Sequence, residues 1–174
     1  MSSPDGRAAS RRAAVAALAA VAALGVGGCG FRLRGEATYA FASVFVSAPA
    51  QPAFATELTR ALESSGGAKV AANAASAQAV VEILSIIDDK QVLSLSPGGR
   101  VQEYALFKSV TFRVRGGDGR EWAPPDEIAV RRSYTYDDSE RLAREIQEQR
   151  LLREMQSDAV SQIVRRLQSV RPPA

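Results

Sequence analysis

The side chains that could carry out chemistry are few. The chain has no histidine and a single cysteine, which excludes a Cys/His zinc site and any histidine-based catalytic triad. The remaining acid–base candidates are Asp88-Asp89 and Asp137-Asp138, each at a point where we expect a strand to end. Aspartates at such points usually bond to local backbone amides, and a cation at Asp88-Asp89 would need a third oxygen ligand that the sequence does not suggest. We therefore predict a protein that is not an enzyme and needs no metal or cofactor.

The single cysteine, Cys29, marks a boundary in the chain. Basic residues come first, at Arg7, Arg11 and Arg12, and an uncharged run of Ala, Val, Leu and Gly follows over residues 13–28. This is the layout of a secretory signal peptide, and the run is shorter than the ~20 apolar residues that a transmembrane helix needs. Its end, Val26-Gly27-Gly28-Cys29, resembles the bacterial lipobox, with valine where that pattern usually has leucine.

Three interpretations of Cys29 compete: a lipid anchor, an exported thiol awaiting a partner, and a buried core cysteine. Its position at the end of a signal sequence favours the lipid anchor, because a core cysteine has no reason to lie there. Each buried methylene group contributes ~0.8 kcal/mol, so the acyl chains of a bacterial lipoprotein cysteine would anchor the protein without spanning the membrane. Gly30 follows the cysteine in place of aspartate, which favours the outer membrane in the lipoprotein families that this segment resembles.

These features divide the chain into four predicted parts. We expect a signal peptide at 1–28, a lipidated tether at 29–38, one domain at 39–168 and a C-terminal tail at 169–174. Ser10-Arg11-Arg12 faintly resembles a twin-arginine signal, although Ala14 stands where a bulky apolar residue is usual, so the export route stays open. In the tether, Phe31-Arg32-Leu33-Arg34 either places arginines near lipid phosphates or forms a simple spacer.

The charge of the chain comes largely from the signal. The net charge of +3 and basic pI of about 9.3 would suit a nucleic-acid binder. Leaving out the three arginines and one aspartate of residues 1–28 gives 19 basic and 18 acidic residues, a net charge of +1. We therefore predict no nucleic-acid partner.

The first elements that we expect are a strand and a helix. The strand covers residues 39–47 and places Tyr39, Phe41 and Phe45 on one side at a period of two,. The helix begins near Pro52 and ends at residues 64–67. Its apolar side chains recur at intervals of three and four, at Phe54, Leu58, Ala61 and Leu62. Residues 69–78 have little pattern, which predicts a short strand start followed by a loop.

Three further strands are expected between residues 79 and 136. The second strand covers 79–87 and continues over 92–95, and a turn follows at 96–99,. The third strand is the longest, and its apolar face consists of Tyr104, Leu106, Val110, Phe112 and Val114, with Lys108 interrupting it. A turn at 116–119 and a crossing segment at 122–125 lead to the fourth strand. Its apolar face carries Ile128, Val130, Tyr134 and Tyr136, with Arg132 among them.

A long helix ends the sequence. Residues 137–140 supply N-cap candidates and acidic charge at its start. Its apolar stripe runs at spacings of three and four with one break near Gln149, and it consists of Leu142, Ile146, Leu152, Met155, Ala159, Ile163 and Leu167. We expect this stripe to be part of the core.

The order of elements predicts an α+β fold. We expect a two-layer sandwich in which a four-stranded, mainly antiparallel sheet packs two helices on one face (β-α-β-β-β-α). The other face of the sheet would be polar, through Glu103, Ser109, Thr111, Arg113, Ala129, Arg131, Ser133 and Thr135. Such a face suits water or the polar lumen of a large outer-membrane barrel equally well.

The same residues resemble a known family, the lipopolysaccharide-assembly lipoprotein LptE. The resemblance rests on five stretches that recur in the family's order: residues 29–35, 92–95, 98–104, 134–138 and 143–159. The family usually has histidine where Arg32 stands, so the basic character at that position is independent of titration here.

The resemblance implies a four-stranded sheet with two helices, a place as a 1:1 plug inside the barrel of LptD, help in assembling that barrel, and binding of lipopolysaccharide at the outer membrane. Arg100, in the turn at the end of the second strand, and Arg144, near the start of the long helix, match basic positions of the family. Each would contact lipid phosphates, although an ordinary solvated charge explains either arginine equally well.

Two other functions remain as alternatives. One is a free-standing periplasmic lipoprotein that binds a lipid or envelope glycan between its helices and sheet. The other is an envelope hydrolase, which would require carboxylates gathered in a cleft.

Overall fold

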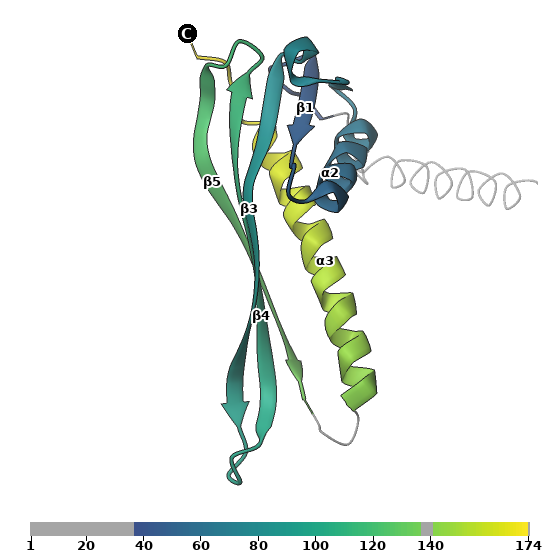
Figure 1. The fold of residues 1–174 in the computed structure, drawn as a ribbon, viewed down its shortest axis with the longest axis vertical. Coiled ribbons are helices and arrows are strands. Elements are labelled where there is room, and N and C mark those ends of the chain that lie inside the picture. Colours follow the sequence, from purple (N-terminus) through teal and green to yellow (C-terminus); the bar gives the residue numbers. More distant parts are fainter. Residues whose placement is uncertain (1–36, 137–140, 174) are drawn as a thin grey trace, which may run out of the picture. The chain divides into compact units, whose positions relative to one another are not determined.

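The computed structural model describes residues 37–136 and 141–173. Their elements, in chain order, are β1 Ser43–Ser47, α2 Pro52–Ser65, β2 Lys69–Val70, the 3-10 turn η2 Ala74–Ser76, β3 Ala79–Leu95, β4 Val101–Gly116, β5 Glu121–Thr135 and α3 Arg141–Leu167 (Figure 1). Cys29, the signal peptide and Asp137-Asp138 lie outside the described residues, so the expectations about them stay predictions.

The sheet has five strands in the order β2-β1-β3-β4-β5. The strands β3, β4 and β5 pair antiparallel, whereas β1 is parallel to both of its neighbours, β2 and β3. The α+β class is confirmed, but the expected four-stranded sheet lacked one strand, Lys69–Val70. The parallel pairs exist because α2 carries the chain back across the sheet before β2, and parallel neighbours require such a crossover.

The first strand uses a different face from the one expected. Val44 and Val46 are buried in the core, while Phe45 is only half-buried. The strand begins at Ser43, after a bend at residue 42, so the period of two does not extend back to Phe41. Phe41 is buried nevertheless, because it packs into the core from the segment before the bend.

The strand β3 is continuous across the predicted break at residues 88–91. Asp88 and Asp89 therefore lie in the middle of the strand, paired with Lys108 and Phe107 of β4, and not at a strand end. Register shifts near Leu84 and Leu93 mark β-bulges in β3. The expectation was wrong because two adjacent aspartates disfavour a strand locally, whereas the facing lysine compensates the charge of one of them.

The strand β5 begins at Glu121 and includes the segment that was expected to cross over. Pro124 and Pro125 fit inside it because β5 is an edge strand, paired with β4 alone. Proline has no N–H to donate, and a position at a sheet edge tolerates that loss.

Both helices pack on one face of the sheet, which we call the inner face, and they contact each other (Figure 1). The inner side of α2 carries Phe54, Leu58 and Leu62, all buried, as the helical spacing predicts. In α3 the buried residues start at Met155 and continue through Ala159, Ile163 and Leu167. Leu142 and Ile146, expected in the same core stripe, are instead 73% and 65% exposed. The helical spacing breaks after Ile146, which lies about 180° around the helix from Met155, so Leu142 and Ile146 face away from the sheet,.

Candidate functional site

The hairpin of β3 and β4 and the first turns of α3 lie at the same end of the described structure, which we call the hairpin end (Figure 1). The turn at its tip closes through Ser96. The Gly99 N–H donates to the Ser96 carbonyl at 2.9 Å, and the Arg100 N–H donates to Ser96 Oγ at 3.1 Å. Gly99 has φ +78°, a conformation that favours glycine,. Arg100 is exposed in this turn, as the sequence suggested.

The second predicted cation, Arg144, lies on α3, about one turn from the start of the helix. It is half-buried, and its guanidinium donates from Nη1 to Gln147 Oε1 at 2.9 Å. The fold therefore brings the segments that carry Arg100 and Arg144 to one end, although 44 positions separate the two arginines in the sequence. Their role in binding lipid stays a prediction.

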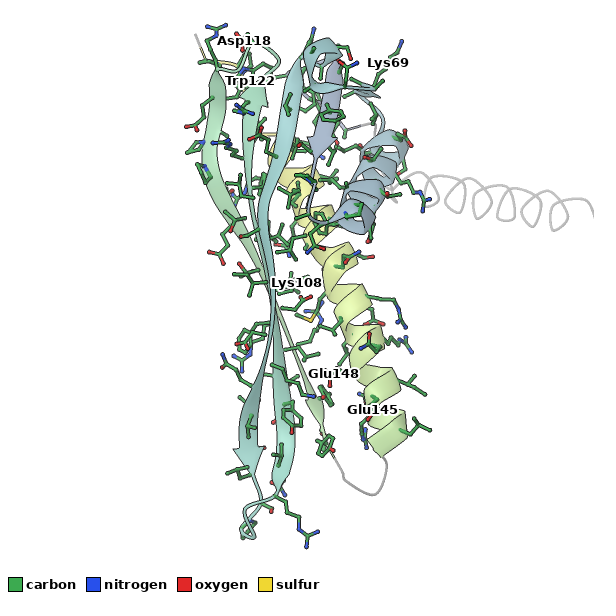
Figure 2. All side chains as sticks on the ribbon, viewed as in Figure 1. Lys69, Lys108, Asp118, Trp122, Glu145 and Glu148 are labelled. Carbon is green, nitrogen blue, oxygen red and sulfur yellow. The ribbon has the colours of Figure 1, made fainter. Side chains whose placement is uncertain are left out.

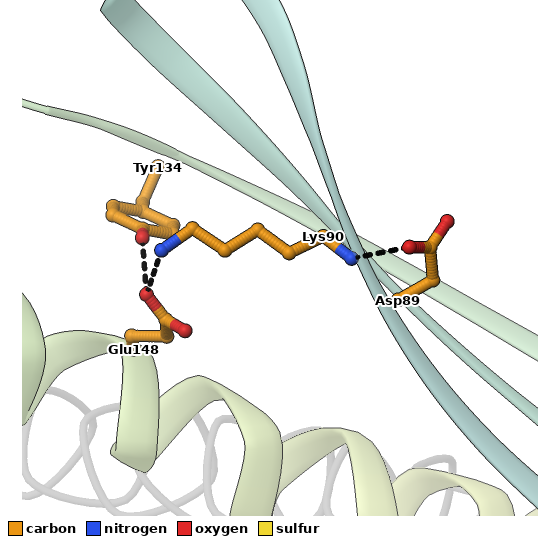
Figure 3. Close-up of polar contacts among 4 residues, drawn as sticks. All are labelled: Asp89, Lys90, Tyr134 and Glu148. Atoms are coloured by element: carbon orange, nitrogen blue, oxygen red, sulfur yellow. Dashed lines mark hydrogen bonds and ion pairs between the residues drawn. The ribbon is translucent and has the colours of Figure 1, made fainter.

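A polar cluster that the sequence analysis missed joins the hairpin to α3. Lys90 Nζ lies 2.5 Å from Glu148 Oε2, and the Tyr134 hydroxyl donates to the same oxygen at 2.5 Å (Figure 3). The ammonium group also lies 4.2 Å from the centroid of the Tyr104 ring. The period of two could not reveal this position, because Lys90 has the opposite parity to buried Val81 and Ile83, and only the β-bulge near Leu84 brings it onto the inner face.

The cluster shifts the pKa values of its members in opposite directions. Burial alone would lower the pKa of Lys90, but hydrogen bonds to Glu148 and Tyr134 outweigh burial and raise it above its usual value,. Burial alone would raise the pKa of Glu148, but the hydrogen bonds from Lys90 and Tyr134 lower it below 4.5. At neutral pH the cluster therefore holds one cation and one anion between sheet and helix.

Large apolar side chains are exposed in the described residues, and most of them lie at this end. The exposed residues are Leu84, Ile87, Val92, Leu93, Leu95, Leu142 and Ile146. Soluble proteins expose single apolar residues routinely, but a group of them commonly marks an interaction site. Five of the seven belong to the end of β3 or the start of α3, so this end presents apolar side chains next to the segments that carry Arg100 and Arg144.

Further ion pairs lie on the inner face of the sheet. Lys108 is only 3% exposed, and its Nζ lies 2.5 Å from Asp88 Oδ1 (Figure 2). This contact explains how a lysine can interrupt the apolar face of β4. Closer to the C-terminus of α3, Arg132 pairs with Asp158 and links β5 to the helix.

The opposite, outer face of the sheet is polar, as the alternation predicts. Glu82 pairs with Arg113 at 2.6 Å and also with Arg115. Burial acts to raise the pKa of Glu82, but the two guanidinium groups outweigh it and lower the pKa below its usual value. On the same face the Arg131 guanidinium lies 5.3 Å from the centroid of the Phe107 ring.

The paired aspartates that lie within the described residues do not form a site. Asp88 and Asp89 are neighbours in a strand, so their side chains point to opposite faces of the sheet and cannot share a ligand,. Within residues 37–136 and 141–173, no three side chains of His, Cys, Asp or Glu come together as a metal site. The helices in this part of the chain are too short or too polar to cross a membrane.

Comparison with known proteins gives a consistent result. The family described as LptE, lipopolysaccharide-assembly, matches residues 41–167. The solution structure of uncharacterized lipoprotein B from Nitrosomonas europaea is 35% identical, with a TM-score of 0.71 over 80% of this chain and 91% of that one. Rare lipoprotein B from Shewanella oneidensis is 26% identical, with a TM-score of 0.64 over 73% of this chain and 94% of that one.

A minor lipoprotein from Acinetobacter baumannii shares the fold at 23% identity, with a TM-score of 0.64 over 77% of this chain and 97% of that one. No curated protein matches the chain.

Proposed function

Because the chain belongs to the LptE lipopolysaccharide-assembly family, we propose that it is the outer-membrane lipoprotein subunit of a lipopolysaccharide translocon. In this role it plugs the LptD β-barrel as a 1:1 partner, assists the assembly of that barrel and binds lipopolysaccharide for insertion into the outer leaflet. Cys29 carries the acyl chains that hold the protein on the periplasmic side of the membrane.

The hairpin end is the observation that carries the lipid part of this proposal. Lipopolysaccharide has acyl chains and phosphate groups in one molecule, so a site for it needs apolar and cationic side chains together. Exposed Leu142 and Ile146 lie in the same first turns of α3 as Arg144, on the other side of the helix, and exposed Val92 and Leu95 lie on the strand that leads to Arg100,. Arginine suits phosphate because its guanidinium can donate two parallel hydrogen bonds.

The outer face of the sheet supports the barrel part of the proposal. Its charged and hydroxyl side chains suit contact with the polar interior of an outer-membrane barrel. Glu82 is compensated by Arg113 and Arg115, and the two guanidinium groups against one carboxylate leave a net positive charge here for a barrel carboxylate to meet.

Co-purification tests the partner. The full chain, isolated from outer membranes in mild detergent, should carry a barrel protein in equal amount. A monomer that never retains a barrel would contradict the translocon role and favour a free-standing lipid-binding lipoprotein.

A substitution at the cysteine tests the anchor. Cys29→Ala should reduce the amount of the protein in the outer membrane. An unmodified thiol on the mature N-terminus, detected by mass spectrometry, would exclude the anchor.

Charge reversal tests the lipid site. Arg100→Glu with Arg144→Glu should weaken lipopolysaccharide binding about tenfold at low salt, because charge-assisted contacts to phosphate are lost, and the difference should shrink as salt is added. The matched control is Arg60→Glu with Arg153→Glu, two exposed arginines on α2 and α3. Equal binding by both double variants would remove Arg100 and Arg144 from the site.

A further inference from the structure

The outer edge of β5 is unpaired within the part of the chain that the structure describes, because β5 is the last strand of the sheet. Pro124 and Pro125 remove donors from the start of this edge, but residues 127–135 contain no proline. Edge strands present N–H and C=O groups that can pair with another strand. The usable edge is therefore the second half of β5.

A groove runs between this edge and α3. One hollow of about 430 Å³ is lined by the residues of β5 from Ala129 to Arg132 and by Asp158, Ser161, Gln162 and Arg165 of α3. A second hollow of about 300 Å³ shares Gln162 and Arg165 with the first and adds Arg166. Because the two hollows share side chains, they form one groove beside the strand edge.

The charge of the groove is positive. Arg132 pairs with Asp158, and Arg166 Nε lies 2.9 Å from Asp126 Oδ2, so two of the four arginines that line the groove are already in ion pairs. A third, Arg131, has its guanidinium over an aromatic ring on the outer face of the sheet. The four side chains of the two ion pairs are at least 40% exposed, and pairs as exposed as these contribute little to stability. Arg165 has no ion-pair partner within residues 37–136 and 141–173. It leaves one uncompensated cation in the middle of the groove.

We propose that the edge of β5 over residues 127–135 accepts an extended, acidic segment of a partner protein, which adds a strand to the sheet and places carboxylates against Arg132, Arg165 and Arg166. Strand addition takes its affinity from main-chain hydrogen bonds and its specificity from alternate side chains. This surface lies on the C-terminal half of α3 and does not depend on lipid binding at the hairpin end.

Charge favours an acidic partner strand over two other candidates for this edge, a second copy of the protein and its own tether. A second copy pairing antiparallel through β5 would bring Arg131 and Arg132 of both chains together, and like charges directly opposite each other are unfavourable. The protein's own tether carries Arg32 and Arg34, so the positive charge of the groove would repel it. An acidic strand would not be repelled in either way, because its charge is opposite to that of the groove.

Binding of designed peptides to the full chain in mild detergent tests the proposal. The probe is a peptide of alternating threonine and glutamate, and its controls are the threonine–lysine version and a version N-methylated at alternate residues. We expect the acidic peptide alone to bind and to slow amide hydrogen exchange in residues 127–135. Arg165→Glu should weaken this binding about three- to tenfold at low salt, whereas Arg153→Glu, on the same helix outside the groove, should not.

Each contrary result overturns a specific part of the proposal. Equal binding of the N-methylated peptide would exclude strand pairing, and equal binding of the lysine peptide would exclude selection by charge. Pyrophosphate that binds in an Arg165-dependent way while the acidic peptide does not bind would make the groove a small-anion site. Circular dichroism of both variants at the same temperature separates loss of binding from loss of folding.

Discussion

At the scale of single residues, the Lys108–Asp88 pair is asymmetric. The Lys108 side chain is 4% exposed, whereas that of Asp88 is 49% exposed. Removing Asp88 leaves a buried ammonium group without its anion, but removing Lys108 leaves a carboxylate that water can still reach. We expect Asp88→Ala to lower the free energy of unfolding by roughly 3 kcal/mol and Lys108→Met to lower it by less than ~1 kcal/mol. Urea denaturation measures both.

Asp89→Ala is the control for this comparison. It changes the same residue type at the next position, on the outer face, where the carboxylate accepts hydrogen bonds from the Lys90 N–H and from Gln91. If Asp88→Ala were no more destabilising than Asp89→Ala, the free energy of unfolding would not depend on the ion pair between Asp88 and the buried ammonium group of Lys108.

The Lys90–Glu148 contact predicts a dependence of stability on pH. The pKa of Glu148 is lowered on folding, so its contribution is present above about pH 4.5 and is lost as pH falls through the lowered value,. The pKa of Lys90 is raised, so its contribution is present below about pH 10.5 and is lost as pH rises through the raised value. Glu148→Gln should lower the free energy of unfolding by about 0.5–1 kcal/mol at pH 7 and have less effect at pH 3.

Glu145→Gln, an exposed residue one turn earlier on α3 (Figure 2), is the matched control. Thermal unfolding of the wild type and both variants at pH 7 and pH 3 makes the comparison. A Glu148→Gln variant whose deficit is the same at both pH values would show that the carboxylate charge contributes nothing to the contact.

At the scale of elements, α3 carries two apolar groups on different sides of the helix. Leu142 and Ile146 are exposed, whereas Met155, nine residues after Ile146 and so about 180° around the helix from it, is fully buried,. Leu142→Ser with Ile146→Ser should change the free energy of unfolding by less than ~1 kcal/mol, and Met155→Ala should lower it by roughly 2–5 kcal/mol. Thermal or urea denaturation distinguishes the two cases.

The same double variant tests the proposed lipid site. Leu142→Ser with Ile146→Ser should weaken lipopolysaccharide binding without unfolding the protein, since acyl chains would lose apolar contacts. Ile87→Ser, which removes an exposed apolar residue from the outer face of β3, should leave binding unchanged. If all variants bind alike, the exposed start of α3 serves some purpose other than lipid contact.

At the scale of the described domain, the apolar core is confined to one half. No residue from 84 to 104, a stretch that the structure describes completely, is buried, whereas β1, α2, the first residues of β3, the second half of β4 and the end of α3 supply most of the core. The hairpin end is held to α3 through Lys90, Tyr134 and Glu148. Such a region should open more easily than the packed half.

Native-state hydrogen exchange measures this difference. Amides of residues 88–95 and 101–104 should exchange faster than those of 79–83 and 110–114, although all of these residues belong to the same two strands. Uniform protection along both strands would mean that backbone pairing alone, without side-chain packing, decides local stability. Lipopolysaccharide should slow exchange at the hairpin end if it binds there.

The sequence by itself determined the α+β class, both helices and the faces of β4 and β5. These features depend on local periodicity, which binary patterns of apolar and polar residues carry directly. It also determined that Arg100 would lie in a turn and that Arg144 would lie near a helix start. The family resemblance followed from residue identities in order along the chain and is confirmed by the match over residues 41–167.

Only the tertiary structure decided which parts of these patterns are buried. The break in helical spacing after Ile146 left open which apolar group of α3 faces the sheet, and the packing of Met155 into the core decided it. The two-residue strand β2 and the continuity of β3 through Asp88 depend on partners far along the chain, Ser43–Val44 and Lys108. The groove beside β5 likewise joins residues from two elements, so no local pattern could predict it.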